Sequence, residues 1–64
     1  MTTTIYDKEG KVMFEYKHSL FVSFDSAVKN VMSVIKEHGK HVKYAIIQSK
    51  KKSAKITHNN IIIL

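Results

Sequence analysis

The chain has 64 residues, of which 44% are hydrophobic, and a formal net charge of +6. This length predicts one small domain, residues 1–64, and the hydrophobic content is too high for a disordered tail. The chain contains no cysteine, which excludes disulfide bonds and thiolate metal sites. Domains this small often need a disulfide, a metal or a partner chain, so a partner chain is the option left open.

No segment has the pattern of a membrane helix or an export signal. The longest aliphatic run is Ile61–Leu64, whereas a membrane helix needs about 20 residues. Residues 1–4 lack the basic region and the apolar stretch of a signal peptide. We therefore expect a cytoplasmic protein that does not contact membranes.

The positive charge is concentrated in the second half of the chain. Residues 1–35 contain four lysines and four acidic residues, whereas residues 36–64 contain seven lysines and one acid, Glu37. The chain has no arginine, the usual residue for reading guanine, while lysine suits phosphate contact. The composition therefore favours a polyanionic partner that is bound with little sequence specificity.

Residues 2–17 have the pattern of a β-hairpin. Thr2–Tyr6 is rich in β-branched and aromatic residues, which favour strands. Asp7–Gly10 then supplies the residue types that form turns. The apolar residues that follow alternate with polar ones, which places three on one face of a second strand: Val12, Phe14 and Tyr16.

The clearest element is an amphipathic helix over about 24–38. Its apolar residues recur at three- and four-residue spacing: Phe24, Ala27, Val28, Val31, Met32, Ile35 and His38. Ser23 is a candidate N-cap, and Gly39 suits the left-handed position that ends a helix. The preceding residues, Leu20–Val22, either extend the sheet or lead into the helix.

Two further strands are expected after the helix. Residues 41–48 alternate, with one strongly apolar face made by Val42, Tyr44 and Ile46. Residues 54–58 form the next strand, with Ile56 facing inward, and Asn59-Asn60 is either a turn or a bulge. We therefore predict an α+β fold, a small antiparallel sheet in ββαββ order with one helix on one face, and a fifth short strand is open.

Six lysines around the loop at residues 49–53 form the candidate nucleic-acid-binding surface. Adjacent ammonium groups repel one another and gain when a polyanion replaces their counterions. The alternative is a solvated loop that only maintains solubility. The lysines concerned are Lys40, Lys43, Lys50, Lys51, Lys52 and Lys55.

The aromatic residues fit a core better than a binding surface. Single-strand binding proteins stack bases on exposed aromatic rings. Here Phe14, Tyr16 and Tyr44 share their expected faces with aliphatic residues, so we expect them beneath the helix. Tyr6 is the aromatic residue most compatible with exposure.

No catalytic or metal-binding motif is present. Zinc needs three or four converging ligands, and the four histidines, His18, His38, His41 and His58, show no such set. We predict no catalytic residue, no metal and no cofactor. The one enzymatic alternative is a small metal-free ribonuclease that uses His and Lys as acid and base, and no motif supports it.

The C-terminal residues are apolar on both faces of any strand that they form. One helix covers one face of a sheet, so half of Ile61, Ile62, Ile63 and Leu64 needs another cover. Either the segment is a central strand or it forms a homodimer interface, and the small size of the chain favours the homodimer. The second copy would contribute the same strand or the strand that contains Tyr6.

We therefore expect a small non-enzymatic binding protein. The first hypothesis is low-specificity binding of nucleic-acid phosphates through the lysine-rich hairpin loop. The alternative is a protein–protein interaction module, such as a small phage- or plasmid-type inhibitor of a host protein. The apolar C-terminus favours the alternative, and the lysines favour the first hypothesis.

Overall fold

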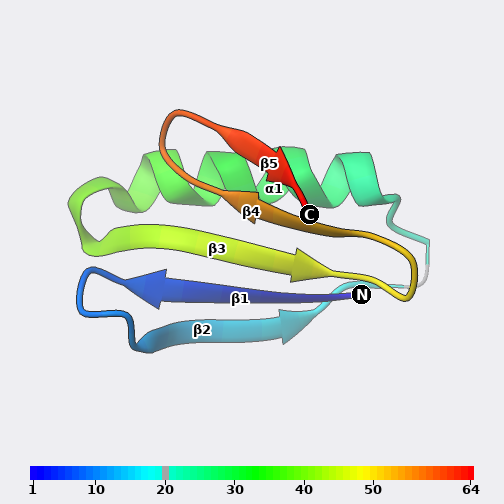
Figure 1. The fold of residues 1–64 in the computed structure, drawn as a ribbon, viewed down its shortest axis with the longest axis horizontal. Coiled ribbons are helices and arrows are strands. Elements are labelled where there is room, and N and C mark those ends of the chain that lie inside the picture. The colour runs from blue at the N-terminus through cyan, green and yellow to red at the C-terminus, as the bar shows by residue number, and fades with distance from the viewer. Residues whose placement is uncertain (20) are drawn as a thin grey trace.

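A computed structural model describes residues 1–19 and 21–64. Its elements follow in the order β1 (Thr2–Asp7), β2 (Val12–Lys17), α1 (Phe24–His38), η1 (Gly39–His41), β3 (Val42–Gln48), β4 (Ser53–Ile56) and β5 (Ile61–Ile63). All neighbouring strands are antiparallel, in the sheet order β2-β1-β3-β4-β5, and α1 packs on β3 and β4 (Figure 1). The predicted α+β fold is confirmed, with β5 as the fifth short strand.

The helix begins and ends where its capping residues predict. The Ser23 hydroxyl accepts a hydrogen bond from the backbone N–H of Ser26 at 3.1 Å, which satisfies one of the free donors at the helix start. Gly39 has a φ of 53°, and its N–H donates to the carbonyl of Ile35. Because few residues other than glycine adopt a positive φ readily, Gly39 ends α1 and turns the chain toward β3.

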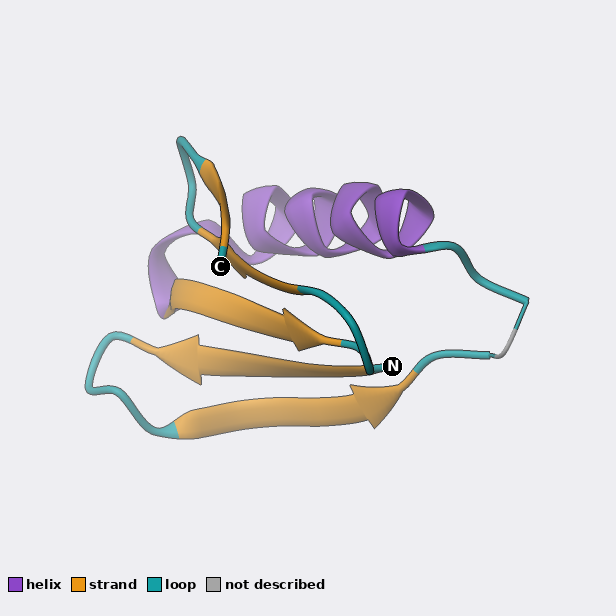
Figure 2. Ribbon diagram, turned by 45° about the vertical axis from the view of Figure 1, so that its right-hand side comes forward, coloured by secondary structure: helices purple, strands orange, loops and turns teal. Residues whose placement is uncertain are grey.

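The core lies between α1 and one face of the sheet. The helix contributes its apolar stripe, and the strands contribute the side chains that alternate inward. The buried cluster consists of Ile5, Ala27, Val28, Val31, Ile35, Val42, Ala45, Ile47 and Ile56. We call the opposite surface of the sheet the open face, because α1 lies on the other side (Figure 2).

A β-bulge in β2 reverses the alternation of its side chains. Ile5 pairs with Phe14, but Tyr6 pairs with Val12, so Met13 is skipped. Since paired residues point to the same face, Val12 shares the open face with Tyr6, while Phe14 stays on the core side with Ile5. The prediction that Val12 and Phe14 share one face is therefore wrong.

A second β-bulge, in β3, has a larger effect on the core. Tyr6 pairs with Tyr44, but Asp7 pairs with Val42, so Lys43 is skipped. Val42 is therefore buried in the core with Ala45 and Ile47, whereas Tyr44 and Ile46 lie half-buried on the open face. The predicted inward face of Val42, Tyr44 and Ile46 is wrong, because the bulge interrupts the two-residue period.

Phe14 and Tyr16 lie on the core side of the sheet at the margin of the helix, where the ring centroids of Phe14 and His38 are 6.0 Å apart. Their strand, β2, is an edge strand separated from β3 by β1. The helix covers β3 and β4, so Phe14 remains 47% exposed and Tyr16 36% exposed. The expectation that these two rings are buried beneath the helix is therefore wrong.

The C-terminal strand is the second edge of the sheet. β5 pairs with β4 alone among the described residues. Residues 61–64 keep between 45% and 68% of their surface exposed, so they do not form a central strand. β1 is flanked by β2 and β3, which excludes the Tyr6 strand as a pairing partner for a second copy.

The connection from β2 into α1 is irregular where the structure describes it. Of the predicted segment Leu20–Val22, Leu20 lies outside the described residues, and Phe21 and Val22 belong to neither a strand nor a helix. Within residues 1–19 and 21–64, no helix is long and apolar enough to cross a membrane.

We predict that the β-bulges give two identical substitutions different effects. Val42→Ala removes two buried methyl groups and should lower the free energy of unfolding by about 2–3 kcal/mol. Val12→Ala, on the open face at 56% exposure, should cost less than about 1 kcal/mol. Urea unfolding of both variants measures the difference, and equal losses would contradict the bulged register.

Candidate nucleic-acid interface

Two tyrosines stack on each other on the open face. Tyr6 of β1 and Tyr44 of β3 are paired across the strands, with ring centroids 4.8 Å apart and an interplanar angle of 29°. Lys55 of β4 places its ammonium nitrogen 4.7 Å from the centroid of the Tyr44 ring. All three residues are half-buried. The open face therefore presents an aromatic pair with a cation beside it.

This arrangement has the chemistry of a base-stacking platform. Nucleobases stack on partly exposed aromatic rings in single-strand binding proteins. The cation–π contact of Lys55 contributes only about 0.5–1 kcal/mol at an exposed site, so it holds the ammonium group over Tyr44 weakly.

At the end of the sheet where β3 begins, the surface is hollowed into an open pocket of about 650 Å³. Its walls come from the β1–β2 turn, η1, the start of β3 and the β4–β5 turn. We call it the basic pocket, because three lysines and a histidine line it and no carboxylate does. The lining residues are Lys8, Gly39, Lys40, Val42, Lys43 and His58.

Local backbone geometry brings these basic side chains together. The positive φ of Gly39 turns the chain directly after α1, which places Lys40 at the pocket wall. The bulge at Lys43 lets that side chain line the pocket although its neighbour Val42 is buried in the core. His58 Nε2 lies 2.7 Å from the carbonyl oxygen of Val42, so Nε2 donates and Nδ1 remains free.

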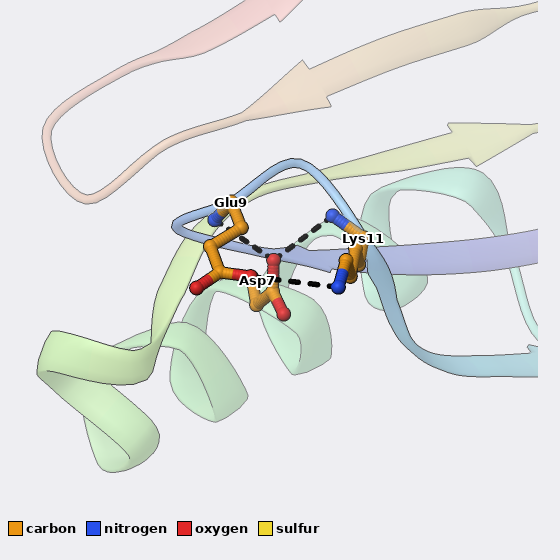
Figure 3. A network of polar contacts seen from close by, with 3 residues as sticks. All are labelled: Asp7, Glu9 and Lys11. Carbon is orange, nitrogen blue, oxygen red and sulfur yellow. Dashed lines mark hydrogen bonds and ion pairs between the residues drawn. The ribbon is translucent and has the colours of Figure 1, made fainter.

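The acidic residues of the β1–β2 turn are occupied within the turn itself (Figure 3). Asp7 Oδ1 accepts hydrogen bonds from the backbone N–H groups of Glu9 and Lys11, each at 2.9 Å. Glu9 Oε2 lies 3.6 Å from Lys11 Nζ, the one ion pair in the described part of the chain. Lys8 therefore lines the basic pocket without a carboxylate partner among those residues.

The six lysines predicted as one surface occupy three separate places. Lys40 and Lys43 line the basic pocket, and Lys55 lies against Tyr44. Lys50–Lys52 lie in the β3–β4 loop, at the other end of β3. Because β3 has seven residues at about 3.3 Å each, roughly 20 Å separates this loop from the basic pocket.

The β3–β4 loop is ordered by its own contacts. The Ser49 hydroxyl accepts hydrogen bonds from the backbone N–H groups of Lys51 and Lys52, at 3.4 Å and 3.0 Å. Lys52 Nζ lies 5.7 Å from the centroid of the Phe24 ring at the start of α1. Lys50 and Lys51 are exposed, which is compatible with the alternative of a solvated loop that only maintains solubility.

Sequence reasoning does not identify three residues of this candidate interface. Tyr44 was expected in the core, because the alternation with Val42 gives no sign of the bulge between them. Lys8 stands among acidic neighbours in the sequence, which hides that those acids are satisfied within the turn. His58 joins Lys8 only through the pairing of strands distant in the chain, and no local pattern indicates that meeting.

Another histidine with defined contacts is His18, at the opposite end of the sheet. Its Nε2 is hydrogen-bonded to the hydroxyl of Thr3, which is fully buried, and its ring centroid lies 5.0 Å from that of Tyr16. Burial lowers the pKa of His18, and the nearby N-terminal ammonium group lowers it further. Burial raises the pKa of Tyr16, and the hydrogen bond with Thr3 offsets part of that rise.

Comparisons with known proteins add no assignment to this geometry. No family model, curated protein or solved structure matches the chain. Within residues 1–19 and 21–64, no three His, Asp or Glu side chains gather as a metal site would require.

We predict that His18 makes the folded state less stable in mild acid. Its pKa in the folded protein lies below the ordinary histidine value of about 6.5, so the unfolded chain binds the proton more readily. The stability is present above about pH 6.5 and is lost as the pH falls through the folded-state pKa. The melting temperature of the wild type should therefore fall more than that of His18→Gln between pH 7.5 and pH 5. Parallel curves would contradict this role of His18.

Proposed function

We propose that the protein binds single-stranded nucleic acid on its open face. Bases stack at Tyr6 and Tyr44, while Lys55 and the lysines of the basic pocket contact the phosphates. The observation that carries this proposal is the aromatic pair, which stands beside a lysine on a face that α1 leaves uncovered. Stacking rings with adjacent cations are the combination that single-strand binding surfaces use.

Two features support a single strand bound with low specificity. Bases in a duplex are stacked on each other, so only an unpaired strand can place a base on Tyr44. The chain contains no arginine, and lysine lacks the planar fork that reads a guanine edge in two hydrogen bonds. Stacking is tolerant of sequence because every base has a π-face.

Binding to an oligothymidine should weaken with salt and with loss of the Tyr44 ring. Four engaged lysines give a slope of about −3 in log K against log salt concentration for a single strand. Tyr44→Leu keeps apolar bulk but removes the stacking surface, which should cost about 1–3 kcal/mol of binding free energy. Fluorescence anisotropy at several salt concentrations measures both effects.

Variants of equal charge separate the candidate lysine surfaces. Lys40→Ala/Lys43→Ala should weaken binding strongly, whereas Lys29→Ala/Lys36→Ala, on the exposed side of α1, removes the same charge with little effect. Lys50→Ala/Lys51→Ala tests the β3–β4 loop. A larger loss there than at the basic pocket would assign the contact to the loop, and an absence of binding at low salt would refute the function.

We also propose that two copies associate through β5. This strand is an edge whose residues 61–64 remain largely exposed, without a charge or a proline to block pairing. The other edge, β2, carries Glu15 and Lys17, which discourage such pairing. A second copy of β5 is self-complementary about a two-fold axis. Burying two isoleucines per chain would contribute roughly 3–6 kcal/mol before the cost of association.

A charge on β5 should therefore separate the two copies. Ile62→Lys should shift a dimer at micromolar concentration to a monomer, as measured by sedimentation velocity. Val12→Lys places the same charge on the other edge strand, also at an exposed open-face position, and should leave the dimer intact. A wild-type monomer under these conditions would overturn the proposal and leave nucleic-acid binding unaffected.

A further inference from the structure

We infer that the basic pocket binds a phosphate monoester, and specifically the terminal phosphate of a bound nucleic-acid strand. The inference rests on the proposed function for the strand, while the pocket itself supplies the case for the phosphate. Lys8, Lys40 and Lys43 line one cavity together with His58, and none of its lining residues is acidic.

Charge distinguishes a terminal phosphate from an internal one. A phosphate monoester carries between −1.5 and −2 charges at pH 7, as phosphorylated side chains do, whereas each internal phosphodiester carries −1. Three ammonium groups around one cavity repel one another, and a dianion relieves that repulsion more completely than a monoanion. Asp7 and Glu9 lie close by, since they line a neighbouring hollow together with Lys8 and Lys40, but Asp7 accepts hydrogen bonds from the turn's own backbone and Glu9 lies 3.6 Å from Lys11.

His58 adds a hydrogen-bonding group of the right kind. Its Nε2 donates to the carbonyl of Val42 at 2.7 Å, which holds the ring at the pocket wall and leaves Nδ1 free. When Nδ1 is protonated, both ring nitrogens are donors, and Nδ1 can then donate a hydrogen bond to an oxygen of the dianion.

The position of the pocket links it to the stacking residues. Lys43 precedes Tyr44 directly, and Asp7, which follows Tyr6, precedes Lys8. Lys43 and Tyr44 are therefore adjacent in β3, and Lys8 stands two residues after Tyr6, in the β1–β2 turn. Because Lys43 is the neighbour of Tyr44, the inference places the terminal phosphate of a nucleotide stacked on Tyr44 at this cavity.

Anisotropy with three otherwise identical short oligothymidines tests the inference: one with a 5′-phosphate, one with a 3′-phosphate and one with neither. One phosphorylated strand should bind at least about tenfold more tightly than the unphosphorylated strand, as expected for a charge-assisted contact. Lys40→Ala/Lys43→Ala should abolish that difference, and Lys29→Ala/Lys36→Ala should retain it. Circular dichroism checks that the variants fold.

Equal affinity for all three strands would overturn the terminal-phosphate inference and leave the proposed function standing. If no strand binds, the proposed function fails and the strand part of the inference fails with it. Titration of inorganic phosphate and of thymidine monophosphate, followed by the amide NMR signals of Gly39, Lys40 and Lys43, then tests the pocket alone. Shifts that are absent in Lys40→Ala/Lys43→Ala support a phosphate site, and unchanged signals refute it.

Discussion

The pairing of Tyr6 with its two neighbouring strands determines which side chains of β2 and β3 reach the open face, the core and the basic pocket. Each neighbour carries one extra residue beside Tyr6, Met13 on β2 and Lys43 on β3. The bulge on β3 lets Val42 enter the core while the adjacent Lys43 lines the basic pocket. Without it, alternation would turn Val42 to the open face, and the core would lose a fully buried aliphatic side chain.

The ratio of helix to sheet explains why so much apolar surface remains exposed. One helix of 15 residues packs on β3 and β4, and the sheet extends past it on both sides. Phe14 and Tyr16 lie exposed on one side, and the isoleucines of β5 lie exposed on the other. A small domain has little surplus stability, so apolar groups left at both margins are natural sites for partners.

The sequence predicted the elements well and the faces of the strands poorly. The spacing from Phe24 to His38 and the caps at Ser23 and Gly39 define the helix locally, and the structure confirms its bounds. Strand faces depend on register, and a skipped residue such as Lys43 leaves no local signal. The basic pocket joins Lys8 to His58 across the sheet, and that juxtaposition follows only from the strand order.

The two proposed surfaces are geometrically compatible. Antiparallel pairing of β5 with its copy relates the two sheets by a two-fold axis perpendicular to the sheet, so both open faces lie on the same side of a continuous sheet. In each copy, Tyr44 lies two strands and Tyr6 three strands from β5, at about 4.8 Å per strand.

The positive charges of the two copies would then act on one strand of nucleic acid, which favours binding at low salt. Each copy has a net charge of +6. The two copies therefore repel each other, which opposes the dimer in the absence of a polyanion. Bound nucleic acid and self-association should therefore strengthen each other, because the phosphates neutralise the charge that β5 pairing brings together.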